Sequence, residues 1–243
     1  MNMVAYRSDP MMYKVGKVQR MCRGKPEEER LRIVHQYIVE HVHYDDDPSL
    51  PVHEAEGFFA YGRAVCDGIS KAAKILLNAV GIPSEIVIGK AVQTPGAVPE
   101  GHAWNMVWIA GCAYHMDFTF DATLAEQDGR MHYDYYKLTD RQIGRDHDLS
   151  ESAGIASTVS ADWFREHKLY FHQEKKLREY LRRELQNNSK TIVFKLPYPK
   201  DPQAVLEDAK KVVREEVQRA NPFGRRYQMV INPTQMVVTV IIL

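Results

Sequence analysis

The feature that most constrains the fold of this chain is an apolar pattern with the period of a helix. A cysteine precedes the pattern, and a glycine and a proline follow it. Between residues 69 and 80 the apolar side chains recur at the spacing of one helix face: Ile69, Ala72, Ala73, Leu76, Leu77 and Val80. Gly81 follows the period and Pro83 prevents its continuation. Cys66 is therefore expected on the buried face of the first turn. The helix dipole and the free N–H groups there favour a thiolate, although a lone buried cysteine is more often a small apolar core residue.

The composition indicates a globular protein and excludes several classes of function. With 44% hydrophobic and 26% charged residues over 243 positions, the chain can form one large or two smaller domains, with no sign of disorder. The net charge is zero, although residues 151–243 hold 16 Lys and Arg against 11 Asp and Glu, so the first 150 residues are correspondingly acidic. Neither part is basic enough to indicate nucleic-acid binding. No run of about 18 apolar residues occurs, so no membrane span is expected.

The cysteines and the N-terminus bear on the cellular compartment. Cys22, Cys66 and Cys112 cannot all pair and lack CxxC spacing, which predicts no disulfide framework and a reducing compartment. Residues 1–7 contain no basic region followed by an apolar run, so no signal peptide is predicted and a cytoplasmic location is expected. A chain whose signal had been removed would look the same and would be extracytoplasmic.

Residues 101–118 have the pattern of a β-hairpin that carries a histidine and an aspartate. Its turn is Ala110-Gly111 or, one residue later, Gly111-Cys112. With the first turn, His102 and Asp117 share a face as diagonal neighbours about 7–8 Å apart, a distance that long side chains can bridge. With the second turn they are four residues apart in register, too far to bond. A working His102–Asp117 pair therefore requires the Ala110-Gly111 turn.

A cysteine at a helix start, together with a histidine and an aspartate on a hairpin, is the arrangement of thiol nucleophilic catalysis. His102 would take the proton of Cys66 and later give it to the leaving group, while Asp117 would fix the imidazole tautomer. The remaining histidines, cysteines and acids match no metal-binding spacing. Neither a metal nor another cofactor is therefore predicted.

Such catalysis also needs hydrogen-bond donors for the oxyanion. The backbone N–H of Cys66 is the first expected donor. The second is expected from one of three side chains: Tyr61, Gln93 or Asn105. Trp104 shares a face with His102 and is a candidate wall of the substrate pocket. The aromatic side chains of residues 58–61 and the loop 91–101 are expected to line or close the site.

Several segments of the sequence resemble the transglutaminase-like family, which includes transglutaminases and shares its core with papain-like cysteine proteases. These segments are Cys66-Asp67-Gly68, Gly81-Ile82-Pro83, Gly101-His102-Ala103-Trp104-Asn105 and Asp117-Phe118-Thr119-Phe120-Asp121. The resemblance covers roughly residues 28–150 and implies an α+β fold, in which a helix carrying the cysteine packs on an antiparallel sheet carrying the histidine and the aspartate. The triad that it implies is Cys66, His102 and Asp117. Ala64 stands where the family often has glycine, and Phe120 where it often has tryptophan, which leaves the pocket shape open.

The chain after the core indicates a connector and a second domain. Residues 141–162 are polar and rich in Ser, Ala and Gly, as in a connecting segment. The order β-α-β-α-β-β that follows predicts a small α+β domain without a nucleophile, metal cluster or phosphate loop. The expected boundaries are an N-terminal arm over 1–27, the catalytic core over 28–150, a connector over 151–168 and the small domain over 169–243.

These features predict a cysteine-dependent enzyme that transfers or hydrolyses amide acyl groups through a thioester. A peptidase or amidase is favoured over a crosslinker, and the expected partner is a protein or peptide substrate. The alternative is a catalytically inactive transglutaminase-like module that binds protein. Domains of this family are bacterial as well as eukaryotic. The sequence leaves the substrate, the acyl acceptor and the oligomeric state open.

Overall fold

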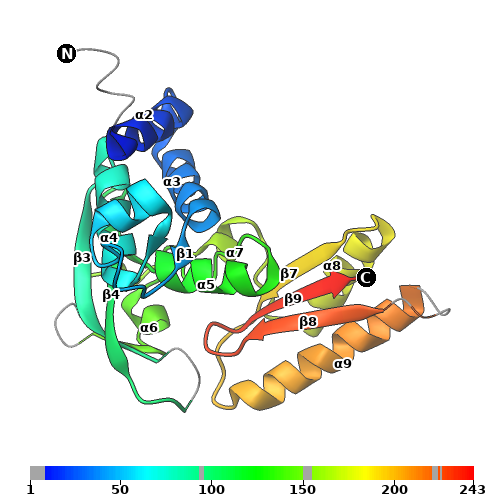
Figure 1. Ribbon diagram of the computed structural model, residues 1–243. Helices are drawn as coiled ribbons and strands as arrows, with labels where there is room; N and C mark the ends of the chain where they lie inside the picture. The colour runs from blue at the N-terminus through cyan, green and yellow to red at the C-terminus, as the bar shows by residue number, and fades with distance from the viewer. Residues whose placement is uncertain (1–8, 93–95, 150–154, 221–223, 225) are drawn as a thin grey trace. The chain divides into compact units, whose positions relative to one another are not determined.

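The computed structural model describes residues 9–92, 96–149, 155–220, 224 and 226–243 (Figure 1). The chain divides into two compact units, Met1–Ser160 and Ala161–Leu243. None of the helices within the described ranges combines the length and the apolar character that a membrane-crossing helix needs.

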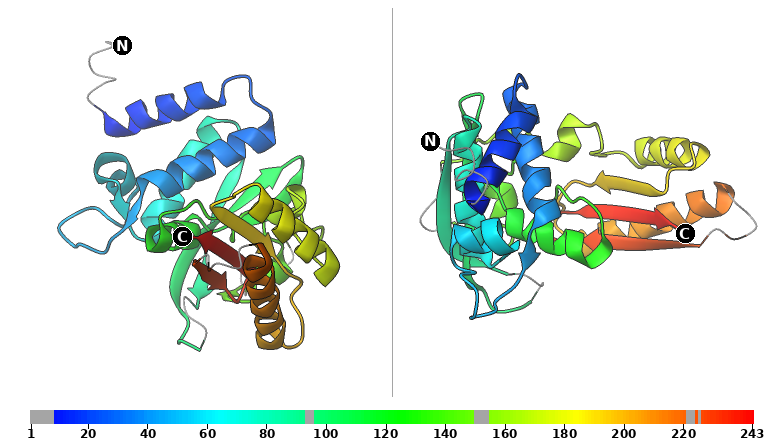
Figure 2. Two further views of the ribbon diagram at one scale, coloured as in Figure 1. Left: turned by 90° about the vertical axis from the view of Figure 1, so that its right-hand side faces the viewer. Right: turned by 45° about the horizontal axis from the view of Figure 1, so that its top comes forward.

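The first unit combines helices with an antiparallel sheet. Its helices are α2 (Pro10–Cys22), α3 (Glu27–His41), α4 (Cys66–Ala79), α5 (Phe118–Asp128) and α6 (Asp140–Ile143). The sheet has the order β5-β4-β3-β6, formed by β3 (Ser84–Ala91), β4 (Glu100–Ile109), β5 (Cys112–Met116) and β6 (His147–Asp148). Helix α4 packs on β3 and β4, and α2 packs against α3 (Figure 2). The predicted α+β class, with the cysteine helix on an antiparallel sheet, is confirmed.

Helix α4 forms as the sequence predicts. All apolar side chains of its stripe are buried, and Gly81 ends the helix with a φ of +77°. That backbone conformation suits glycine because other residues meet their own Cβ there. Cys66 is the first residue of the helix, after a two-residue strand β2 (Arg63–Ala64) that pairs in parallel with β1 (His43–Tyr44).

The hairpin turns at Ala110-Gly111, as the His102–Asp117 pair requires. Ala110 has a φ of 49° and Gly111 a φ of 79°, and the two-residue turn that matches strand twist needs positive φ at both positions. In the resulting register Asn105 pairs with Met116, and Ile109 pairs with Cys112. The first of the two predicted turns is therefore confirmed.

Two segments of this unit differ from the sequence prediction. The second hairpin strand was expected to continue through Phe118, but β5 ends at Met116 and helix α5 follows. The first five residues of α5 are all buried, so this helix lacks the polar face by which a helix is recognised in a sequence. Residues 141–148 were expected in a polar connector. They instead form the last part of α6 and strand β6, with Ile143, Asp146 and His147 buried.

The second unit is a three-stranded antiparallel sheet with helices. It contains α7 (Trp163–Glu166), α8 (Glu174–Gln186), β7 (Thr191–Lys195), α9 (Pro202–Ala220), β8 (Tyr227–Asn232) and β9 (Val237–Ile242), with strand order β7-β9-β8. The apolar segment at residues 169–171, the first strand of the predicted order, is reduced to one bridge between Tyr170 and Lys195. Asp201 caps α9, since its Oδ1 accepts the N–H of Ala204 at 3.0 Å. The Asn-Pro-Phe-Gly sequence at residues 221–224 is typical of a helix end but lies mostly outside the described residues.

Candidate active site

Cys66 lies at the start of α4 and is partly exposed. Its position depends on Gly68, in the first turn of the helix. A Cβ atom at Gly68 would overlap the carbonyl oxygen of Val52 and lie 3.1 Å from that of Glu54. Both contacts are with backbone, which cannot rotate away. Glycine therefore lets the loop before the helix pass close to its first turn, where the cysteine is presented.

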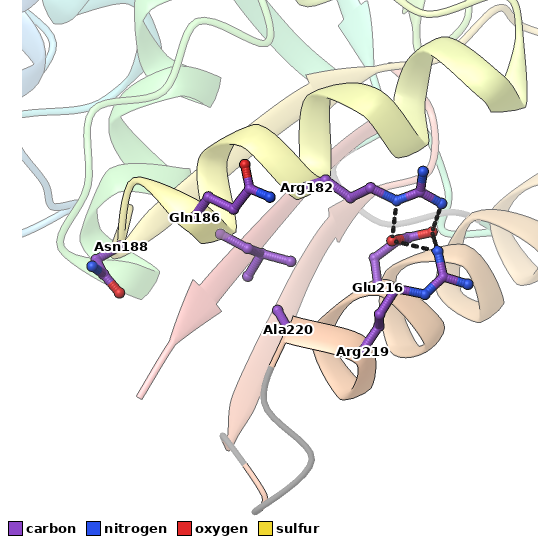
Figure 3. Close-up of a pocket in the computed structure, with 7 residues that line it drawn as sticks. Arg182, Gln186, Asn188, Glu216, Arg219 and Ala220 are labelled. Carbon is purple, nitrogen blue, oxygen red and sulfur yellow. Dashed lines mark hydrogen bonds and ion pairs between the residues drawn. The ribbon is translucent and has the colours of Figure 1, made fainter.

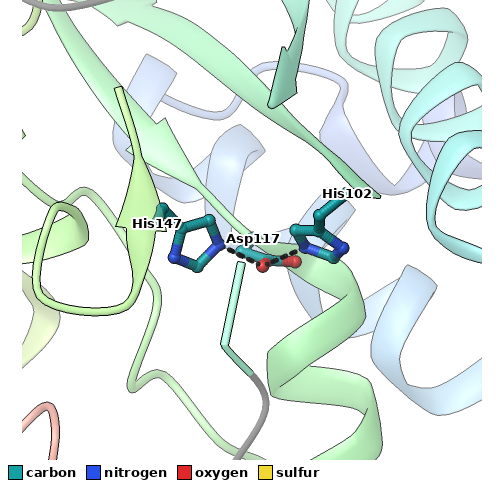
Figure 4. Close-up of side chains that lie close together, drawn as sticks. All are labelled: His102, Asp117 and His147. Carbon is teal, nitrogen blue, oxygen red and sulfur yellow. Dashed lines mark hydrogen bonds and ion pairs between the residues drawn. The ribbon is translucent and has the colours of Figure 1, made fainter. Parts of the chain in front are cut away.

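His102 and Asp117 are hydrogen bonded inside this unit (Figure 4). His102 Nε2 lies 2.8 Å from Oδ2 of Asp117, and both side chains are buried. The other carboxylate oxygen, Oδ1, accepts the backbone N–H groups of Thr119 at 2.9 Å and Phe120 at 3.0 Å. Asp117 is thus the N-cap of α5, and its two oxygens have different roles: Oδ1 caps the start of the helix and Oδ2 holds the histidine.

The electrostatics of the pair favour a charged imidazole beside the cysteine. Burial disfavours the imidazolium form of His102, but the charge and hydrogen bond of Asp117, together with a hydrogen bond that the ring donates to Cys66, raise the pKa of His102 to about 10. Burial likewise opposes the ionised form of Asp117, yet the two neighbouring histidines hold the pKa of that carboxyl well below its usual range. Because Nε2 of His102 is bound to Asp117, Nδ1 is the ring nitrogen left to face Cys66.

A second histidine contacts the same carboxylate, and the sequence prediction missed it. His147 Nε2 lies 3.0 Å from Oδ2 of Asp117, and its Nδ1 lies 2.7 Å from Oδ1 of Asp146. The hydroxyl of Tyr135 donates to the other oxygen of Asp146 at 2.6 Å. Figure 4 shows Asp117 between the two imidazoles. No motif in the sequence marks His147, because its short strand is brought to the site by pairing with β3.

His102, Asp117 and His147 also lie close enough to be tested as a metal site, since their ligand atoms are within 4.8 Å of one another. A metal ligand must direct a lone pair at the ion. Here both Nε2 atoms instead point at the same carboxylate oxygen at hydrogen-bond distance. The geometry is that of two N–H groups donating to one carboxylate.

Asn105 is not suited to be the oxyanion donor that the sequence suggested. Its side chain is fully buried, and its Nδ2 donates to the backbone oxygen of Ser70 at 3.1 Å. Ser70 Oγ in turn donates to the backbone oxygen of Ala103 at 3.0 Å. The amide is therefore used to join β4 to the middle of α4, one turn beyond the cysteine, and this expectation is corrected.

The aromatic candidates separate into buried and exposed groups. Phe58 and Phe59, expected to line or close the site, are core residues. Trp104 is also buried rather than lining a pocket: its ring stacks beside His102 at 6.1 Å and its Nε1 donates to His115. Tyr61 is about half exposed at the end of a short π-helical turn, Gly57–Tyr61. Gln93 lies outside the described residues.

Tyr44 is a further residue near the cysteine. Burial raises the pKa of the Tyr44 phenol, and the neighbouring Cys66, Asp46, Glu100 and Asp67 add to the effect. The parallel pairing of Tyr44 with Ala64 brings it to the segment that leads into Cys66. The surroundings of the thiol are thus acidic, which agrees with the acidic first part of the sequence.

A separate hollow in the second unit lies between α8 and α9 (Figure 3). Arg182 and Arg219 face it, but both bind Glu216, whose carboxylate is buried. Arg178 donates to the same carboxylate at 2.9 Å. The three arginines share the internal carboxylate of Glu216, and Arg178 also pairs with Glu174 and Glu215, so the hollow has the character of a structural ion-pair cluster.

Comparison with known proteins finds a family model that matches part of the first unit. A family model described as the transglutaminase-like superfamily matches residues 17–118, a range that includes Cys66, His102 and Asp117. The search of curated proteins finds no match.

Three solved structures are similar to part of the chain. A proposed cysteine protease from Cytophaga hutchinsonii is 19% identical with a TM-score of 0.36, over 43% of this chain and 37% of that one. A TGase is 22% identical with a TM-score of 0.36, over 43% and 30%. A proposed protease from Parabacteroides distasonis is 14% identical with a TM-score of 0.33, over 42% and 22%. The chain therefore spans well under half the length of each. Residues 17–118 are thus similar to the transglutaminase-like superfamily.

Proposed function

We propose that this protein is a cysteine-dependent enzyme that transfers or hydrolyses amide acyl groups, with Cys66 as nucleophile, His102 as general acid and base, and Asp117 as the residue that orients His102. The observation that carries the proposal is the continuous series of contacts from Cys66 through His102 to the buried Asp117 carboxylate. A partly exposed cysteine at a helix start, paired with an imidazole, is placed to form a thiolate–imidazolium pair.

The reaction would proceed in two halves. Nδ1 of His102 takes the proton from Sγ of Cys66, and the thiolate attacks the carbonyl carbon of an amide. The C–N bond breaks as His102 returns the proton to the leaving nitrogen, which leaves a thioester on Cys66. His102 then takes a proton from water or from an amine. The attack of that acceptor releases a carboxylic acid or a new amide, and His102 protonates the departing Cys66 thiolate.

We infer a protein or peptide as substrate, and water as the preferred acceptor, which makes the enzyme a peptidase or amidase rather than a crosslinker. The family match supports an acyl-transfer cysteine enzyme in general. A backbone N–H of the first turn of α4 is the proposed oxyanion donor, because N–H groups in a first helical turn lack an intrahelical acceptor.

The three cysteines allow a direct test by alkylation. Iodoacetamide labelling at pH 6, followed by peptide mass spectrometry, should modify Cys66 in preference to the other two. Burial raises the pKa of the Cys22 thiol, so Cys22 should stay unlabelled. Cys112 is exposed and serves as the reference for an accessible thiol without a histidine partner.

A catalytic role is tested separately with a library of amide and peptide substrates, with and without an added primary amine. Wild type should release the leaving amine, and Cys66→Ser should not. If Cys66 labels no faster than Cys112 at pH 6, the protein is the inactive binding module and the proposal fails. Incorporation of the amine in place of hydrolysis would assign crosslinking instead.

A further inference from the structure

We propose that His147 is a positioning residue of the active site. It is a buried imidazolium, fixed by Asp146, whose charge acts through Asp117 and weakens the attraction between that carboxylate and the proton on His102. The inference rests on the proposed function for its catalytic meaning, but its structural content is independent of turnover. It is carried by the contacts of His147 on both ring nitrogens.

The contacts define the charge of His147. Both ring nitrogens face carboxylate oxygens, at 3.0 Å from Asp117 and 2.7 Å from Asp146. An ionised carboxylate can only accept, so each ring nitrogen must carry a hydrogen. An imidazole with both nitrogens protonated is a cation. Three aromatic rings surround it, those of Trp104 at 4.8 Å, Phe120 at 5.0 Å and Tyr135 at 6.0 Å between centroids, and aromatic faces favour a cation over a neutral ring.

The charges along the series alternate in sign. Beginning at the cysteine they are the Cys66 thiolate, the His102 imidazolium, the Asp117 carboxylate, the His147 imidazolium and the Asp146 carboxylate. A lone buried carboxylate beside His102 would hold the imidazolium so firmly that it gave up its proton slowly. A second cation on the same oxygen shares the negative charge of Asp117, and so makes His102 a better acid toward the leaving group.

The sheet is built to deliver His147 to this place. Strand β6 pairs with the end of β3, with Ala91 opposite His147, and the N–H of Val92 donates to the backbone oxygen of Asp146 at 2.8 Å. At Gly89 a Cβ would lie 2.8 Å from the backbone oxygen of Asp148 and 2.9 Å from the ring of Trp104. Gly89 is the register partner of His102, so the close approach of β6 occurs beside the catalytic histidine.

Within the described part of the chain, five titratable groups are in contact with His147 or next to such a contact. They are His102 on β4, His115 on β5, Asp117 before α5, and Tyr135 and Asp146 in the segment that follows it. Of these, His115 accepts from Trp104 on Nδ1 and is bound to Asp140 through Nε2, so it is neutral. The charge balance around His147 is therefore set by Asp117, Asp146 and His102.

The protonation of His147 can be read without any substrate. In full-length protein labelled with ¹⁵N-histidine, NMR correlation spectra at pH 7 should show two ring N–H groups for His147. A neutral ring with a single N–H at pH 7 would overturn the proposal. This measurement uses the unaltered protein and needs neither a reactive Cys66 nor turnover.

The coupling to His102 is tested in a Cys66→Ser background, where the thiolate no longer holds the proton on His102. Asp146→Asn preserves the geometry, because the amide can accept from Tyr135 and donate to Nδ1 of His147, while His147 becomes neutral. The NMR midpoint for His102 deprotonation should then move to higher pH. His147→Gln should move it further, by about one pH unit or more, because it removes the cation and leaves the distant Asp146 anion.

His132→Gln is the matched control, since His132 is another buried histidine between two carboxylates, Asp128 and Asp134, and does not contact Asp117. It should leave the His102 midpoint unchanged. An unchanged or lower midpoint in both Asp146→Asn and His147→Gln would refute the inference. The alkylation test reports the proposed function separately, so a slow Cys66 with a doubly protonated His147 would refute that function and leave this inference standing.

Discussion

Asp117 holds His102 with one carboxylate oxygen and begins a helix with the other. The Nε2–Oδ2 distance is 2.8 Å, and Oδ1 accepts two backbone N–H groups in the first turn of α5. The orientation of the imidazole is therefore set by a side chain that is itself fixed at four points, by two histidines and two amides. Rigid support of this kind is what a general base requires.

Substitution of Asp117 should separate its two roles. Asparagine is also a good N-cap, so Asp117→Asn keeps the helix start but removes the charge beside His102. We expect alkylation of Cys66 at pH 6 to fall about tenfold or more, measured by peptide mass spectrometry. Asp117→Ala should lower the free energy of unfolding by a further ~1 kcal/mol through loss of the cap. The control is Asp201→Ala, which removes a cap from α9 only; it should lower the free energy of unfolding by a similar amount and leave the alkylation rate of Cys66 unchanged. An equal alkylation rate in wild type and Asp117→Asn would contradict the proposed role of Asp117 in orienting His102.

The hairpin turn should be improvable. Ala110 has a left-handed backbone, which costs a residue with a Cβ more than it costs glycine or asparagine. Ala110→Gly or Ala110→Asn should therefore raise the free energy of unfolding by about 0.5–1 kcal/mol, measured in urea. Gly111→Val, at a φ of 79°, should lower it by at least as much. Destabilisation by Ala110→Gly would show that the turn has a different conformation.

The approach of the loop to α4 predicts a large effect at one glycine and a small effect at another. Gly68→Ala places a Cβ against the backbone of Val52 and Glu54, so it should destabilise the protein by ~2 kcal/mol or more. Gly101 lies next to His102, and no atom lies within 4 Å of a Cβ there. Gly101→Ala should change the melting temperature little. Equal melting temperatures for the two variants would mean that the loop is not packed on the helix start.

Stability should fall at alkaline pH through a buried histidine away from the site. Burial opposes the charged form of His132, but Asp134 and Asp128 raise its pKa from 6.5 to about 9. Its contribution to stability is thus complete below about pH 6.5 and is lost as the pH rises through 9. His132→Gln should flatten the decline of the unfolding free energy between pH 7 and 10, measured in urea at several pH values. His102 contributes a slope of the same sign, so part of the decline should remain. Substitution of His172, an exposed histidine, should not alter it.

Local chemistry in the sequence was sufficient to place α4 and the hairpin. The apolar period with Gly81 predicts the helix, and the hairpin pattern predicts that His102 and Asp117 share a face. Of its two possible turns, only Ala110-Gly111 lets the pair bond, and the structure has that turn. The period and the hairpin are both short-range patterns, in which each residue is close in the chain to the residues that decide its structure. Asn105 did not need a structure to be rejected as an oxyanion donor, because alternation along β4 places it on the side opposite His102, toward the core.

The remainder depended on contacts distant in sequence. Helix α5 is buried from its first residue, which removes the polar face by which helices are recognised. Strand β6 has two residues, and only its partner β3 makes it a strand. His147 was therefore assigned to a connector, although it contacts the same carboxylate oxygen as His102. The acids around Tyr44 likewise come together only in the folded chain.

The shared role of Asp117 ties chemistry to folding. If the first turn of α5 frays, the carboxylate that caps it is released, and the same event frees the imidazole of His102. If Cys66 is the nucleophile that we propose, a damaged or incompletely folded copy would therefore carry a thiol of ordinary, slow reactivity. The reactivity of Cys66 would then depend on complete folding of the start of α5.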